Sequence, residues 1–87
     1  MSNADNGKRF AFAIAREVNL LSKRCDVLRA DIAKEFDSDT LVTKAQDLAR
    51  ALHTMEVLDR LFTDATGERL TGLLLRDILN EYLEQQS

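Results

Sequence analysis

The sequence has no proline and no tryptophan, and its 87 residues include only one cysteine and three glycines. Without proline, nothing forces a long helix to break. One cysteine excludes a disulfide framework within the chain, and one cysteine with one histidine cannot supply the four ligands of a structural zinc site. Because so short a chain buries a limited fraction of its surface, its stability must come from well-packed helices or from association with another chain.

Charge and hydropathy exclude further classes of protein. The chain carries 12 basic and 15 acidic residues, a net charge of −3, whereas dedicated nucleic-acid binders usually show a basic excess. No apolar run approaches the roughly 18 residues of a membrane span, and the start lacks the pattern of a secretory signal. A lone cysteine fits a reducing compartment. We therefore expect a cytoplasmic protein with no membrane association, residues 1–7 being a disordered end or tag remnant and residues 8–87 a single domain.

The first periodic segment predicts one long amphipathic helix over about residues 8–36. Its apolar seam alternates steps of three and four residues, the heptad pattern by which one helix follows another. The seam consists of Ala11, Ile14, Val18, Leu21, Cys25, Leu28 and Ile32. The only cysteine thus lies on the face that is expected to be buried.

Two further helices are predicted, over about 40–65 and 68–85. The polar stretch 37–40 indicates a helix end and a new N-cap at Ser38 or Asp39, and Gly67 provides the left-handed residue that ends the second helix. Gly72 would lie inside the third helix at a cost of about 1 kcal/mol. Because the first connection is short, the first two helices are expected to form a long antiparallel hairpin with Cys25 opposite Leu52. The fold class is all-α, bundle-like or coiled-coil-like.

The third helix is too short to cover the whole hairpin. We expect it to cover the second helix from Ala65 to Leu48, together with the N-terminal half of the first. The far end would be two helices thick, and exposed apolar surface of that kind usually marks an association site. We therefore predict a homodimer that completes a four-helix layer at the hairpin tip or pairs along the whole hairpin, the alternative being a monomeric three-helix bundle. The predicted interaction surface consists of Leu28, Ile32, Phe36, Leu41, Val42 and Ala45.

Asp59 occupies a core position in the heptad register of the second helix. A buried carboxylate requires a partner, and Arg16 on the facing stretch of the first helix is the candidate. This pair would be a polar element of the seam that fixes register. The alternative is that Asp59 lies at the edge of the seam.

Cys25 and the only histidine, His53, are the candidates for chemistry. Phosphotransfer domains carry a reactive histidine on the flank of a helical bundle, but those domains have lysine and glycine where this chain has Glu56 and Val57. A Cys25–His53 pair would resemble a nucleophile and its base, but seam cysteines usually act as small buried hydrophobes. We expect both residues to have packing or surface roles, with no catalytic site, metal or cofactor.

A basic stripe recurs every seven residues along the first helix at Arg9, Arg16 and Lys23. Such a stripe suits nucleic-acid phosphates, but no aromatic residue interleaves with it for base stacking. The expected function is a non-enzymatic protein–protein interaction module (an adaptor, regulator or assembly subunit) that presents apolar helix faces to a protein partner. The alternatives are a phosphotransfer bundle using His53 and a small nucleic-acid-associated regulator using the basic stripe.

Overall fold

The computed structural model describes residues 3–86, with side chains from residue 7 onward, and it is all-helical over that range. The helices are α1 (Asn3–Lys34), α2 (Ser38–Thr66) and α3 (Gly72–Gln86). The prediction of a three-helix, all-α chain is confirmed. Of residues 1–7, expected to be disordered or tag-derived, 3–7 continue α1, and 1–2 lie outside the described residues. None of the described helices contains a stretch long and apolar enough to cross a membrane.

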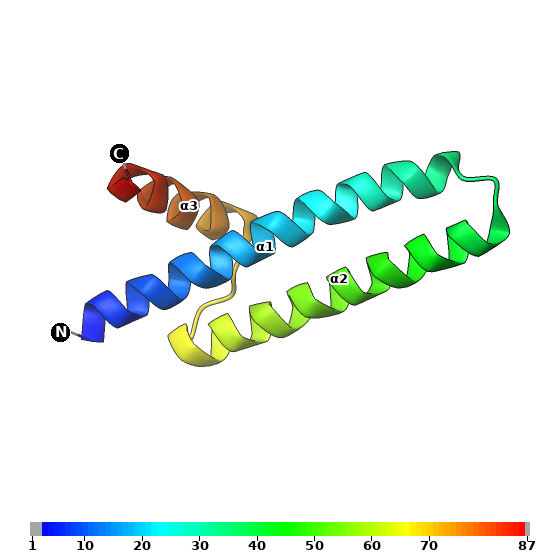
Figure 1. The fold of residues 1–87 in the computed structure, drawn as a ribbon. Coiled ribbons are helices and arrows are strands. Elements are labelled where there is room, and N and C mark those ends of the chain that lie inside the picture. The colour runs from blue at the N-terminus through cyan, green and yellow to red at the C-terminus, as the bar shows by residue number, and fades with distance from the viewer. Residues whose placement is uncertain (1–2, 87) are drawn as a thin grey trace.

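Helix α1 is the central element, with α2 along one side and α3 on the other (Figure 1). Helix α2 runs back beside α1, whereas α3 crosses the N-terminal half of α1 obliquely. Within the described chain, no Cα atom of α3 lies within 8 Å of a Cα atom of α2. The expectation that the third helix covers the second from Ala65 to Leu48 is therefore wrong, although side chains of α3 join the apolar cluster that contains Phe62 of α2. Because the connection 68–71 carries the chain past α1 before α3 begins, α3 docks on α1.

The main apolar cluster lies where the three helices approach one another. Ile14 and Val18 of α1 and Phe62 of α2 are buried at its centre. Around them pack partly buried side chains from all three helices and the second connection: Phe10, Ala11, Met55, Leu58, Leu70, Leu74, Leu75 and Ile78. Farther toward the tip, buried Cys25, Leu28 and Ala51 continue the interface between α1 and α2. The heptad seam of α1 thus faces α2 along most of its length.

The register between α1 and α2 differs from the expected one by about one helical turn. Cys25 Sγ lies 4.0 Å from Met55 Sδ, whereas Leu52, its expected neighbour, is exposed. Nearer the tip, Lys44 Nζ lies 3.2 Å from Glu35 Oε2. Since residue 44 lies beside residue 35, the first turn of α2 extends past the end of α1, as Figure 1 shows at the right of the hairpin.

The helix ends are set by local hydrogen bonds. Asp37, one residue before the expected Ser38, caps α2 with φ −83° and ψ 122°. Gly67 adopts φ 76°, and its N–H donates to Thr63 O at 2.8 Å, which confirms the predicted left-handed end of α2. Gly72 is the first residue of α3 and not an interior one, and a Cβ built on it would meet nothing within 4 Å. The cost expected for a glycine in the interior of the helix therefore does not arise.

Candidate interaction surface

The apolar side chains around the hairpin tip are the candidate site. We call Ile32, Phe36, Leu41, Val42 and Ala45 the tip surface. Phe36 is 99% exposed, Leu41 and Val42 are also exposed, and Ile32 is half-buried. Leu28, which the sequence placed on this surface, is instead buried between α1 and α2. The surface therefore begins one turn closer to the tip than expected.

The stagger of the two helices explains why the tip is exposed. Glu35, the residue that follows α1, contacts Lys44 in the second turn of α2, so the C-terminal end of α1 lies beside that turn. Leu41 and Val42 lie in α2 ahead of this contact and have no α1 turn opposite them. Apolar residues that project beyond their covering helix form the kind of patch that usually marks an association site.

Glu35 holds the corner between α1 and α2. Its Oε1 accepts hydrogen bonds from the backbone N–H of Asp37 at 3.0 Å and of Phe36 at 3.1 Å, while Oε2 accepts one from Lys44 Nζ at 3.2 Å. The Asp37 N–H first, and then Lys44, hold the pKa of the Glu35 carboxyl below its usual value. The sequence did not single out this residue, because a glutamate at the end of a helix is too common a pattern.

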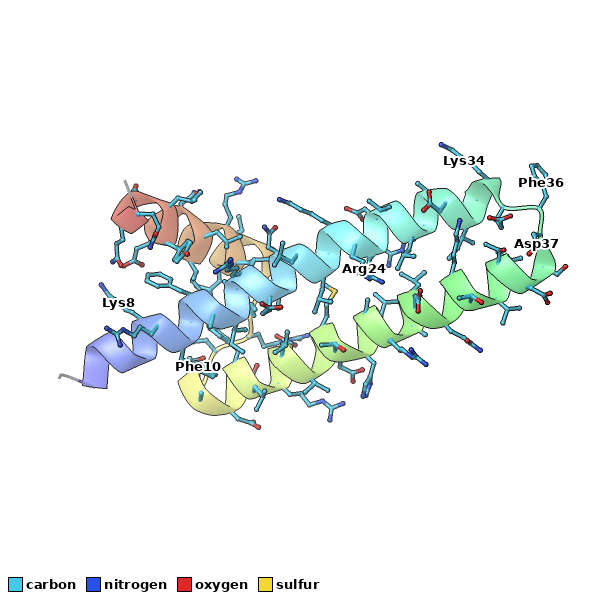
Figure 2. The ribbon with its side chains drawn as sticks, viewed as in Figure 1. Lys8, Phe10, Arg24, Lys34, Phe36 and Asp37 are labelled. Carbon is cyan, nitrogen blue, oxygen red and sulfur yellow. The ribbon has the colours of Figure 1, made fainter. Side chains whose placement is uncertain are left out.

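Asp37 fixes the other side of the same corner. Its Oδ2 accepts hydrogen bonds from the Thr40 backbone N–H at 2.9 Å and from Thr40 Oγ1 at 2.7 Å. Phe36 therefore lies between two residues whose carboxylates anchor the backbone on either side of it. Figure 2 shows its ring pointing away from the hairpin. The ring is therefore exposed on a backbone that is held on both sides.

The cap gives a testable dependence on pH. The Thr40 N–H, and next its hydroxyl, lower the pKa of Asp37 from its ordinary value of 3.8. When folding lowers the pKa of a carboxyl, that carboxylate stabilises the fold fully at a pH above its pKa in the unfolded chain. The stabilisation is lost as the pH falls through the pKa of the carboxyl in the folded chain. We expect Asp37→Ala to lower the thermal unfolding midpoint at pH 7, measured by far-UV circular dichroism.

The matched variant Asp37→Asn keeps a capping side chain. The thermal unfolding midpoint of Asp37→Asn should be close to that of wild type at pH 7. Because this variant has no carboxyl to protonate at residue 37, its midpoint should fall less than that of wild type as the pH is lowered. If Asp37→Ala unfolds at the wild-type temperature, the cap contributes nothing to the stability of the fold.

The structure does not bring the predicted pair Asp59 and Arg16 together. Asp59 Oδ1 accepts a hydrogen bond from the backbone N–H of Leu70 at 3.3 Å, which ties the connection before α3 to α2. Arg16 is exposed on the side of α1 that faces α3, where it lines a hollow beside Tyr82. The partner of the Asp59 carboxylate is thus a backbone N–H of the second connection. The heptad register alone could not indicate this partner.

Cys25 and His53 are also kept apart. Cys25 is 1% exposed and packs against Met55. His53 is exposed, and two residues along a helix correspond to a rotation of about 200°, so it points away from the α1-facing side on which Met55 lies. Within the described residues, no group of three or more metal-binding side chains comes together.

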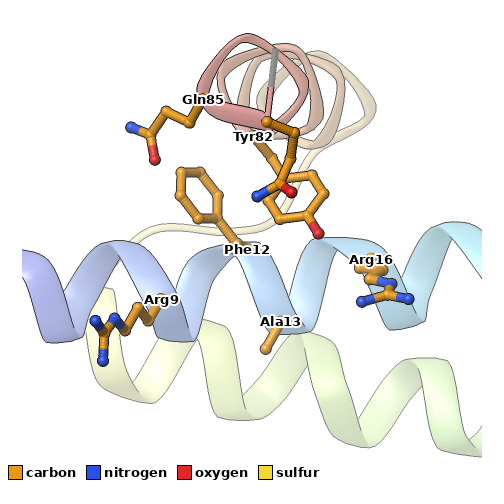
Figure 3. Close-up of a pocket in the computed structure, with 7 residues that line it drawn as sticks. Arg9, Phe12, Ala13, Arg16, Tyr82 and Gln85 are labelled. Carbon is orange, nitrogen blue, oxygen red and sulfur yellow. The ribbon is translucent and has the colours of Figure 1, made fainter.

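A second surface lies between α1 and α3. The rings of Phe12 and Tyr82 meet edge to face with centroids 5.4 Å apart and planes inclined by 62°. Two hollows of about 370 and 330 Å³ open beside Tyr82, and we call them together the α1–α3 groove. Figure 3 shows the side chains that line the first of them. Both hollows are lined by Arg16. None of the described residues that line either hollow is acidic: Arg9, Phe12, Ala13, Arg16, Asn19, Leu20, Lys23, Leu79, Tyr82, Leu83, Gln85 and Gln86.

Comparisons with protein-family models, with curated proteins and with solved structures found no match for this chain. The function is therefore inferred from the two surfaces just described.

Proposed function

We propose that the protein is a non-enzymatic helical interaction module, an adaptor, regulator or assembly subunit, that forms a homodimer through its tip surface. The observation that supports this most is Phe36, which is 99% exposed while Glu35 and Asp37 hold the backbone on either side of it. Burying a phenylalanine is worth about 1.5–3 kcal/mol. An anchor whose backbone is already held loses less conformational freedom on binding than one in a mobile loop.

Two arrangements of the dimer bury the tip surface. In one, two tips stack to complete a four-helix layer, and in the other, two hairpins pair along their length. Either would remove Phe36, Leu41 and Val42 from water. In the cytoplasm, where we place the protein, the buried thiol of Cys25 stays reduced and the dimer forms without an interchain disulfide. The exposed helix faces that remain would bind helices of a partner protein.

The proposal predicts that Phe36→Ser weakens self-association. Since each copy loses one buried aromatic anchor, we expect the dissociation constant to rise by at least about tenfold. Sedimentation velocity over a concentration series measures this. Far-UV circular dichroism should be unchanged, because Phe36 makes no contact with the core.

The matched control is Val57→Ser, which changes an exposed apolar residue on α2 away from the tip. It should associate like wild type. A wild-type chain that remains monomeric at high concentration, or a Phe36→Ser variant that associates like wild type, would contradict the proposal.

A further inference from the structure

We propose that the α1–α3 groove binds an acidic amphipathic helix of a partner protein. This inference rests on the proposed role of the chain as an interaction module and deepens it, because it names the surface that receives the partner helix and the chemistry of that helix. The tip surface takes no part, since it lies at the opposite end of the hairpin (Figure 1). The two surfaces can therefore be tested separately.

The groove follows α1 for about four helical turns. Its first hollow begins beside Arg9 and its second reaches Lys23, and Arg16 and Tyr82 line both, so the two hollows adjoin. Between Arg9 and Lys23, α1 rises about 21 Å. A partner helix of about 15 residues is therefore long enough to lie along the whole groove.

Apolar side chains in the groove remain partly uncovered. Leu20 of α1 is 50% exposed and Leu83 of α3 is 62% exposed, and both line the second hollow. Between the two helices lie three half-buried side chains, Phe12, Leu79 and Tyr82. Amphipathic helices bind by laying their apolar face into such a groove. The apolar side of a third helix would cover what α1 and α3 leave exposed.

A row of cations borders this apolar area. Arg9, Arg16 and Lys23 recur every seven residues, so they project from nearly the same side of α1. Figure 3 shows Arg9 and Arg16 on either side of the two aromatic rings of the groove. Among residues whose side chains the structure describes, none of the three cations has a carboxylate within ion-pair distance. The cations are therefore available to an acidic partner.

The carboxylates of α1 and α3 lie off the groove. Those whose side chains the structure describes all lie outside both hollows: Glu17, Asp26, Asp31, Asp77, Glu81 and Glu84. Asp26 and Glu81 each form an ion pair with another basic side chain, at 3.7 and 3.1 Å. Glu17 follows Arg16 directly and is therefore rotated from it by about 100°. In a chain whose net charge is −3, the groove is thus locally basic and complementary to an acidic ligand.

The spacing of the cations defines the partner helix. Carboxylates that recur every seven residues along one flank of a helix come level with the three cations, while apolar residues at the neighbouring positions enter the groove. Arginine can bind a carboxylate through two parallel hydrogen bonds. Complementary charges of this kind steer association and fix the orientation of the partner.

The apolar lining favours a helix over a nucleic acid. Leu20, Leu79 and Leu83 offer no hydrogen bond to a phosphate or a base edge. Single-stranded nucleic acids bind by stacking bases on open aromatic faces, whereas the rings of Phe12 and Tyr82 already meet edge to face at 5.4 Å between centroids. The same cations beside leucines suit glutamates beside leucines.

Selection from a displayed peptide library tests the inference without a known partner. Each peptide is about three heptads long, with a fixed leucine seam and random residues at the flanking positions. We expect selection on the wild-type chain to enrich peptides that carry glutamate or aspartate at heptad spacing. Enrichment of neutral or basic peptides, or no enrichment at all, would overturn the inference.

Arg16→Glu and Leu20→Ser test the two features of the groove with an enriched, fluorescently labelled peptide. Fluorescence anisotropy should show the dissociation constant rising about tenfold or more for Arg16→Glu, because attraction becomes repulsion. Leu20→Ser should raise it about fivefold, because the peptide loses an apolar contact. Both side chains are exposed, so both variants should fold as wild type does, and near-UV circular dichroism of Tyr82 checks this.

Arg50→Glu, which reverses an exposed arginine on α2, is the matched control and should bind the peptide like wild type. An Arg16→Glu variant that also binds like wild type would overturn the inference. A uridine oligonucleotide that binds more tightly than the peptide, with an affinity unaffected by Leu20→Ser, would assign the groove to nucleic acid and would likewise overturn it.

Phe36→Ser separates the inference from the proposed function. This variant should self-associate weakly and bind the peptide like wild type, whereas Arg16→Glu should show the reverse. If Phe36→Ser weakens self-association while the library yields no acidic peptide, the proposed dimer stands and the inference is overturned. If wild type remains monomeric while the acidic peptide binds the groove, the dimer is overturned and the inference stands.

Discussion

Phe62→Ala should lower the free energy of unfolding by about 3–5 kcal/mol, the cost of removing a buried aromatic ring and leaving a cavity. Phe62 is 3% exposed and packs with Ile14 and Val18, the two residues at the centre of the only cluster that all three helices share in the described chain. Total stabilities of natural domains lie near 5–15 kcal/mol. In a domain of this size, the loss is a large share of the total.

Urea denaturation followed by far-UV circular dichroism measures this loss. The matched variant is Leu61→Ala at the neighbouring position, because Leu61 is about half exposed and points to a different side of α2. Its cost should stay below about 1 kcal/mol. Equal losses for the two variants would contradict the assignment of Phe62 to the centre of the core.

The faces of the helices could be predicted from the sequence, whereas their relative placement could not. The heptad spacing identified Ile14, Val18 and Cys25 as inward-facing, and all three are buried. Periodicity, however, fixes rotation about the helix axis and leaves sliding along it undetermined. The position of α2 against α1 depends on the corner at Glu35, where one carboxylate bonds two backbone N–H groups and Lys44.

The same distinction applies to the candidate site. The sequence predicted an exposed apolar tip from helix lengths alone, and Phe36, Leu41 and Val42 are exposed there. It placed Phe36 at the end of the first helix, whereas the structure places it in the connection after Lys34. The α1–α3 groove was not predicted, because its hollows depend on how α3 crosses α1. That crossing follows from the four-residue connection after Gly67, which carries no periodic pattern.

Helix α3 depends on a small set of apolar contacts. Its polar ties include an ion pair from Lys8 to Glu81 at 3.1 Å, which is exposed and worth about 0–1 kcal/mol, and, in the preceding connection, the hydrogen bond from Leu70 N–H to Asp59. Apolar side chains such as Leu74 and Ile78 also attach α3, because they pack against the shared cluster. Removing one of these contacts should affect α3 more than α2.

Ile78→Asp should release α3 from α1 and cost about 2–4 kcal/mol, because it removes apolar contacts and places an unpaired carboxylate against the cluster. The chain has one tyrosine and no tryptophan, so near-UV circular dichroism of Tyr82 reports its contact with Phe12 directly. We expect that signal to collapse while most of the far-UV helix signal remains. Leu73→Asp changes an exposed leucine of the same helix and should leave the tyrosine signal intact. An unchanged signal in Ile78→Asp would mean that the ion pair and the connection hold α3 in place without the apolar contact.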